Sequence, residues 1–213
     1  MRKRRLSLLA ASLFLAGFGT ADANLIVNGS FETPDVGNGY QIFANGSVPG
    51  WTSNNNEIEI DYSNILGGPA YAGRQSAELN GNTFDTISQT VSGLKAGEQY
   101  LLSWAYGSRP SYGPQQTLVS FGGTPVATDS STGAAASSLD WSLNSFVVTA
   151  DASSEALSFA ALNEPGYNGG GGNEIDAVSL TRDPAAVPEP GSLLLLGTGV
   201  ATLFLARRRG RKI

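Results

Sequence analysis

The chain has 213 residues, with 27 glycines but no cysteine and no histidine. Disulfides, thiol nucleophiles, histidine-based triads and the usual zinc sites are therefore excluded. The formal net charge of −5 hides an uneven distribution, because nine of the thirteen Lys and Arg residues lie in the first five and last seven positions. Residues 24–186 hold sixteen acidic and four basic residues, a net charge of −12. Such an acidic body excludes nucleic acid as a partner and favours cations.

Residues 1–23 are predicted to be a secretory signal peptide. Four basic residues at positions 2–5 precede an apolar run over residues 6–18. Ala21 and Ala23 then occupy the small-residue positions of a cleavage site. Cleavage after Ala23 would leave Asn24 as the new N-terminus and would export the rest of the chain.

Residues 24–183 are predicted to fold as one all-β domain. No stretch places apolar residues at the spacing of a helix. Short apolar runs recur instead between clusters of Gly, Pro and Asn, which is typical of strands joined by turns. This many short strands indicates an antiparallel jelly-roll β-sandwich. The expected strands are residues 25–28, 40–44, 57–62, 76–80, 84–91, 98–107, 117–121, 125–128, 143–149, 156–162 and 175–181.

The last of these strands places a carboxylate among apolar residues. Alternation along a strand would put Asp176 on the same face as Val178 and Leu180, which are typical core residues. A buried carboxylate needs a partner. Calcium, which binds oxygen ligands, would satisfy Asp176. Backbone N–H groups of a turn are the alternative.

Aromatic and basic side chains in the loops are the candidates for ligand binding. The three tryptophans, Trp51, Trp104 and Trp141, are expected in the core because of their large apolar area. Loops carry function more often than the scaffold does, so sugar stacking is expected from loop tyrosines and hydrogen bonding from arginines beside them. The candidates are Tyr71, Tyr112, Tyr167, Arg74 and Arg109, and each is alternatively a solvated loop residue.

Several segments of the body follow a shared pattern in the same order. They are residues 24–32 (NLIVNGSFE), Gly50-Trp51, and residues 73–81, 87–91, 96–103 and 173–180 (NEIDAVSL). The pattern resembles galactose-binding-like jelly rolls, including carbohydrate-binding modules of families 4 and 22 and the domain-of-unknown-function group 642. The resemblance implies a jelly-roll fold and carbohydrate binding. It also implies a structural calcium ion held by Glu32 and Asp176.

The last thirty residues have three parts. A linker over residues 184–190 contains Val187-Pro188-Glu189-Pro190, where the prolines disfavour a helix. Residues 191–206 are uncharged and apolar, and are predicted to be a short transmembrane segment. Residues 207–213 form a basic tail that contains Arg207, Arg208 and Arg209 and is expected in the cytoplasm.

This order of parts resembles the PEP-CTERM sorting signal of Gram-negative bacteria. The resemblance implies recognition by an exosortase, cleavage near the Pro-Glu-Pro, and release or attachment at the cell surface. Before that processing, the C-terminal segment would hold the precursor in the inner membrane. A plain C-terminal anchor is the alternative.

The expected function is that of an exported carbohydrate-binding module at the cell surface or in the extracellular matrix. Its partners would be an exosortase and a polysaccharide, with calcium as a structural cofactor and no nucleic acid. A structural matrix protein without a specific ligand is one alternative. A glycoside hydrolase, which needs only two carboxylates, is another. No acidic pair stands in a recognisable catalytic motif, so we expect no enzyme.

Overall fold

A computed structural model of the chain describes residues 23–132, 139–163, 165–166 and 171–183. The predicted signal peptide up to residue 22 and the whole C-terminal sorting signal lie outside these residues, as does Tyr167. No helix in the described part of the chain is long and apolar enough to cross a membrane.

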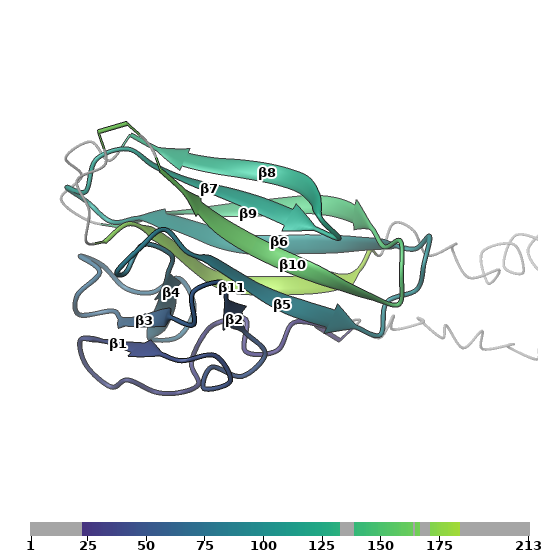
Figure 1. Ribbon diagram of the computed structural model, residues 1–213, viewed down its shortest axis with the longest axis horizontal. Helices are drawn as coiled ribbons and strands as arrows, with labels where there is room; N and C mark the ends of the chain where they lie inside the picture. The colour runs from purple at the N-terminus through teal and green to yellow at the C-terminus, as the bar shows by residue number, and fades with distance from the viewer. Residues whose placement is uncertain (1–22, 133–138, 164, 167–170, 184–213) are drawn as a thin grey trace, which may run out of the picture.

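The described residues form two antiparallel sheets. Sheet A has the strand order β1-β3-β4-β11-β6-β9, and sheet B has the order β2-β5-β10-β7-β8. Figure 1 shows the longer strands running along the molecule, with β1 to β4 gathered at one end. The strands are β1 Tyr40–Phe43, β2 Thr52–Ser53, β3 Ile58–Tyr62, β4 Gln75–Glu78, β5 Thr86–Ser92, β6 Gln99–Ser108, β7 Gln115–Phe121, β8 Thr124–Ser131, β9 Asp140–Thr149, β10 Ser154–Leu162 and β11 Asn173–Arg182.

The predicted all-β antiparallel sandwich is confirmed, and ten of the expected strands coincide with observed ones. The prediction of a strand at residues 25–28 is wrong, because positive φ angles at Asn28 (52°) and Phe31 (55°) turn the chain there. That segment still lies beside β11, since Leu25 N–H donates to Leu180 O at 2.9 Å. The two-residue strand β2 was not predicted.

One hydrophobic core fills the space between the sheets. Alternate residues of each strand point into it, including Ile58 and Ile60 from sheet A and Phe159 from sheet B, all fully buried. Trp51 and Trp104 are buried in this core, as predicted, with 1% and 0% of their surfaces exposed.

The outer face of sheet A is covered at one end. Leu66 and Ala70, in the connection between β3 and β4, are buried against Leu139 and pack with Trp141. This connection folds back over the ends of the central strands. Side chains that alternate away from the core are therefore removed from water in this region, although they belong to the outer face.

A bulge in β11 changes the predicted orientation of Asp176. The register with β6 shifts between Asp176 and Ser179, and Ala177 has a φ of 48°. Asp176 consequently lies opposite Ala105, on the outer face, whereas Leu180 lies opposite Leu102 in the core. The prediction that Asp176 shares a face with Val178 and Leu180 is wrong, because the extra residue reverses the alternation.

Candidate functional site: a buried acidic cluster beside a polar cleft

Carboxylates line up across three neighbouring strands of sheet A. Glu78 on β4 pairs with Glu59 on β3 and with Glu174 on β11, so the three residues form one row. Asp61 lies two residues along β3, opposite Ser76. Since Ile58, Ile60 and Ala77 face the core, alternation places this acidic cluster of Glu59, Asp61, Glu78 and Glu174 on the outer face.

The acidic cluster is buried in spite of its charge. Glu59 has 8% of its surface exposed, and the other three carboxylates have 2% or less. Among the described residues one cation contacts them: Arg109 Nη1 lies 3.1 Å from Asp61 Oδ2 and 2.6 Å from Glu78 Oε2. The Arg109 side chain is itself only 14% exposed. A single guanidinium thus faces four carboxyl groups in a region with little water.

Hydrogen bonds satisfy only part of the cluster. Ser76 Oγ donates to Glu174 Oε2 at 2.8 Å. Asp61 Oδ1, Glu78 Oε1 and Glu174 Oε1 are buried, and no donor among the described residues reaches them. In Asp61 and Glu78 these are the oxygens that Arg109 does not contact. Unsatisfied carboxylate oxygens of this kind are rare in folded proteins.

Burial and mutual repulsion raise the pKa values of Glu59, Asp61 and Glu174. Burial raises the pKa of Glu59 to about 7, and the charge of Glu78 adds to the increase. Burial raises the pKa of Asp61 to about 9, with further increases from Glu78 and Glu59. The pKa of Glu174 is also raised well above its ordinary value, first by burial and then by Asp61 and Glu78. Arg109 opposes each of these increases.

The geometry of the cluster suits a cation. Carboxylate oxygens of Glu59, Asp61 and Glu78 all lie within 4.8 Å of one another, so these residues could hold a metal ion. Sequence reasoning missed this set. Acidic residues alternating with isoleucine in β3 normally indicate a strand with one solvated face, whereas here Arg109 and Gly81 lie against these acids.

A polar cleft of about 330 Å³ lies beside the acidic cluster, and Arg109 belongs to both. Trp141 on β9 borders the cleft. Its ring lies against Gly107 on β6, where a Cβ would be 2.9 Å from Trp141 Cε3. The cleft is lined by Tyr106, Ser108, Arg109, Pro110, Ser130, Ser131, Thr132, Asp140, Trp141 and Ser142.

Trp141 differs from the other two tryptophans. It is half-buried on the outer face, its Nε1–H donates to Pro69 O at 2.9 Å, and it packs edge-on to Tyr71 with ring centroids 6.2 Å apart. Tyr71 is 44% exposed. The prediction that Trp141 belongs to the core is therefore wrong, because the missing side chain of Gly107 lets its ring lie on the sheet surface.

The structure divides the predicted ligand-binding residues into three places. Tyr71 lies with Trp141. Tyr112 stacks on Arg109, whose Cζ is 5.1 Å from the ring centroid, and this pair lies next to the acidic cluster. Arg74 is exposed and pairs with Asp35 at 2.8 Å, away from both.

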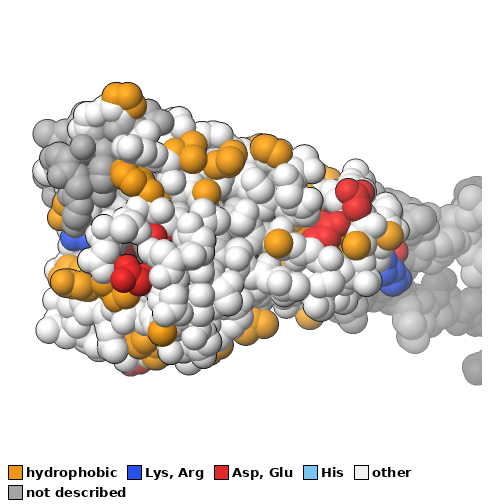
Figure 2. Space-filling model, in the orientation of Figure 1, with side chains coloured by type: hydrophobic (Ala, Val, Ile, Leu, Met, Phe, Trp, Pro, Cys, Tyr) orange, Lys and Arg blue, Asp and Glu red, His pale blue; other side chains and the backbone are white. Residues whose placement is uncertain are grey.

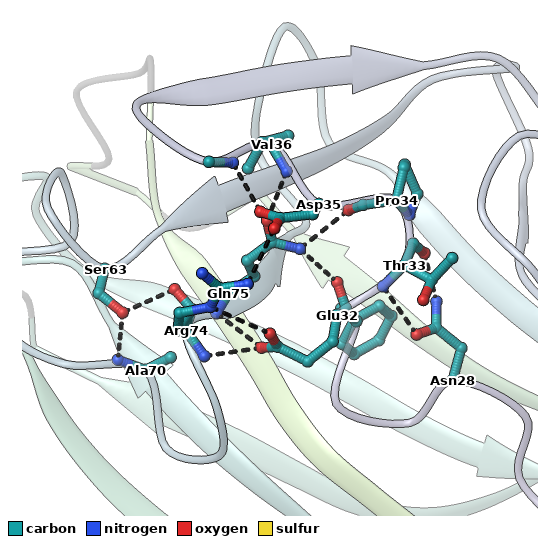
Figure 3. A network of polar contacts seen from close by, with 12 residues as sticks. Asn28, Glu32, Thr33, Pro34, Asp35, Val36, Ser63, Ala70, Arg74 and Gln75 are labelled. Carbon is teal, nitrogen blue, oxygen red and sulfur yellow. Dashed lines mark hydrogen bonds and ion pairs between the residues drawn. The ribbon is translucent and has the colours of Figure 1, made fainter.

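Glu32 ties the N-terminal segment to the start of β4, as Figure 3 shows. Its Oε1 accepts hydrogen bonds from the N–H groups of Arg74 at 2.7 Å and Gln75 at 2.9 Å. The Gln75 side chain completes the tie, because it donates to Phe31 O at 2.8 Å and accepts from Val36 N–H at 2.6 Å. Glu32 Oε2 lies 4.0 Å from Arg74 Nε.

Asp176 contacts the same connection from the other side. Its Oδ2 accepts from Ala72 N–H at 2.7 Å, and its Oδ1 accepts from Ala177 N–H at 2.6 Å. Burial raises the pKa of Asp176 to about 7, and the charge of Glu32 contributes to the increase. The structure thus gives Asp176 the backbone N–H partners that were the alternative to calcium. Calcium at Glu32 and Asp176 stays a prediction.

Figure 2 shows how sparsely charge is spread over one face of the molecule: acidic side chains form two small groups and basic side chains are scarce. The high acidic count therefore does not produce one continuous charged surface on that face. Several of the carboxylates are instead buried in the cluster.

Comparison with known proteins identifies the C-terminal segment. Residues 186–209 match the PEP-CTERM protein-sorting motif, which confirms the sorting signal predicted there. Halomucin of Haloquadratum walsbyi (strain DSM 16790 / HBSQ001) is 30% identical over 205 residues. The alignment covers 92% of this chain, but this chain spans only 2% of the length of halomucin.

Several solved structures with a similar body are carbohydrate-binding modules. A CBM22-1 xylan-binding domain from Paenibacillus barcinonensis aligns with a TM-score of 0.46 and 14% identity, over 78% of this chain and 97% of that one. A family 35 module from Clostridium thermocellum aligns with a TM-score of 0.42 and 15% identity, over 68% and 98%. The fold of this chain is defined by its own strand order and register.

Proposed function

We propose that this chain, which carries a PEP-CTERM sorting motif, is a surface protein whose β-sandwich binds carbohydrate outside the cell. The motif implies export, processing by an exosortase and delivery to the cell surface. The polar cleft beside Trp141 is the observation that supports carbohydrate binding. A polysaccharide of the extracellular matrix is the ligand class that fits both features.

The composition of the cleft matches the chemistry of sugars. A sugar ring presents hydroxyl groups around its edge and C–H groups on its faces, so it is bound by hydrogen-bonding side chains together with an aromatic ring. The cleft offers hydroxyl groups from Ser108, Ser130 and Ser142, a carboxylate from Asp140 and the ring of Trp141. Its volume of about 330 Å³ is at the lower end of ordinary ligand sites, which suits one or two sugar rings at a time.

A structural calcium ion at Glu32 and Asp176 is a further part of the proposal. Both carboxylates contact the connection between β3 and β4, and carboxylate oxygens are the ligands that calcium prefers. An ion at this position would join the first segment of the domain to its last strand. Its role would be to stabilise the fold and not to contact the sugar.

The test is binding of the purified protein to a panel of bacterial and plant polysaccharides, with wild type, Trp141→Ala and Tyr40→Ala compared. Tyr40 is a matched control because it is a 61% exposed aromatic residue that does not line the cleft. We expect saturable binding that Trp141→Ala weakens at least tenfold and Tyr40→Ala leaves unchanged. No binding to any polysaccharide would contradict the proposal and favour a structural matrix protein without a specific glycan ligand.

A further inference from the structure

The acidic cluster lacks positive charge on one side. Among the described residues four carboxyl groups meet one guanidinium, and Asp61 Oδ2 and Glu78 Oε2 are the carboxylate oxygens that Arg109 contacts. The opposite oxygens, Asp61 Oδ1 and Glu78 Oε1, are buried without a donor among the described residues, and Glu174 Oε1 shares this condition. Ionised carboxylates are costly to bury unless a cation or a hydrogen-bond donor meets them. A cation on the side away from Arg109 would satisfy these oxygens.

We propose that the acidic cluster binds one calcium ion, with Glu59, Asp61 and Glu78 as ligands and Glu174 beside them. This site is separate from the Glu32–Asp176 pair and does not depend on carbohydrate binding. Its support is the combination of a compact set of carboxylate oxygens with buried oxygens that no donor satisfies.

The spacing of the ligands is compatible with calcium, and the burial of the site disfavours magnesium. Oxygen ligands lie about 2.3–2.6 Å from Ca²⁺, so two ligands on opposite sides of the ion are separated by about 4.6–5.2 Å. The oxygens of Glu59, Asp61 and Glu78 lie within 4.8 Å of one another, so none of their separations exceeds what one Ca²⁺ can bridge. Mg²⁺ is smaller and keeps several waters, which a region as dry as this one accommodates poorly.

Neighbouring residues fit the proposed site. Arg109 holds Asp61 and Glu78 by their other oxygens and so fixes the direction of the free ones. Gly81 lies against Glu59, because a Cβ at this position would collide with Glu59 Oε2. Glu59 is the most exposed member of the cluster, at 8%, so the ion would enter beside it. A bound ion would then link β3 and β4 directly.

The experiment is calorimetric titration of calcium into the full chain, purified in a mild detergent and freed of metal with chelator. Wild type is compared with the double variant Glu59→Gln/Glu78→Gln and with Glu32→Gln as a matched control. The glutamines keep the side-chain volume and remove only charge. We expect the double variant to lose one calcium site, or to bind at that site at least tenfold more weakly, whereas Glu32→Gln retains the site.

Three results would overturn the proposal: no calcium binding by wild type, the same number and affinity of sites in the double variant, or loss of every site in Glu32→Gln. Circular dichroism in chelator checks that the double variant is folded. If it is not, Asp61→Asn replaces it, and unchanged calcium binding in a folded Asp61→Asn protein would equally refute the assignment. Polysaccharide binding is measured separately, so failure of one proposal does not decide the other.

Discussion

Arg109→Met should destabilise the protein more than any other exchange of a basic residue in the described part of the chain. The guanidinium makes two ion pairs, at 3.1 Å and 2.6 Å, with carboxylates that are at most 1% exposed. Methionine fills a similar volume but leaves these charges without a partner. Removing one member of a buried ion pair costs about 3–5 kcal/mol of the free energy of unfolding. We expect a loss in this range at pH 8.

The loss should depend on pH in a definite direction. The folded-state pKa values of Glu59 and Asp61, about 7 and about 9, lie above those of the unfolded chain. A group with a raised pKa contributes stability at low pH and loses it as pH rises through the folded-state pKa. Arg109 opposes this loss by stabilising the ionised form. Its removal should therefore cost less at pH 5, where Glu59 and Asp61 are both mostly protonated, than at pH 8, where Glu59 is mostly ionised.

The assay is urea denaturation of wild type and Arg109→Met at pH 5 and pH 8, both in chelator so that no cation replaces the guanidinium. Arg74→Met is the control, since Arg74 is 57% exposed and its ion pairs lie at the surface. We expect this control to change stability little at either pH. A loss below about 1 kcal/mol for Arg109→Met at pH 8, or an equal loss at both pH values, would refute the reasoning.

Three further predictions concern separate parts of the molecule. Trp51→Ala removes a buried ring whose centroid lies 5.0 Å from that of Phe31, so urea denaturation should show a free energy of unfolding lower by about 3–5 kcal/mol. A decrease of less than half this amount would contradict the place of Trp51 in the core. Gly107→Ala puts a Cβ against the Trp141 ring and should change tryptophan fluorescence and weaken polysaccharide binding. An unchanged fluorescence spectrum would show that the Trp141 ring does not lie against residue 107. Glu32→Gln keeps an oxygen that accepts the backbone hydrogen bonds but removes the charge. Its Tm should therefore lie below that of wild type in calcium and match it in chelator, and an equal decrease in both would exclude calcium at this residue.

Sequence alternation predicted most of the fold because each strand buries one face. In β6, for example, Tyr100, Leu102, Trp104 and Tyr106 alternate with smaller residues, and all four are buried in the structure. The exceptions have local causes. The strand β2 has only two residues, too few for any periodic signal. The bulge in β11 inserts a residue without changing the apolar pattern, so the orientation of Asp176 could not be inferred.

The candidate site was less accessible to sequence reasoning. Tyr71 and Arg109 were expected near a ligand because they lie outside the predicted strands, and the structure places both beside the cleft region. The surroundings of Glu78 come from a distant part of the chain, since Arg109, thirty-one positions away, lies 2.6 Å from its carboxylate. Contacts over such separations leave no periodic trace in either segment.

The hydrogen bond between Leu25 and Leu180 fixes which end of the body carries the sorting segment. It places the beginning and the end of the body together, and Asp183 N–H donates to Gln99 O at the start of β6. The cleft is at the other end of the same strand, where Ser108 lines it. Nine steps of about 3.3 Å separate the two ends by about 30 Å. The cleft therefore lies at the end of the body remote from Asp183, the last residue before the segment that carries the sorting motif.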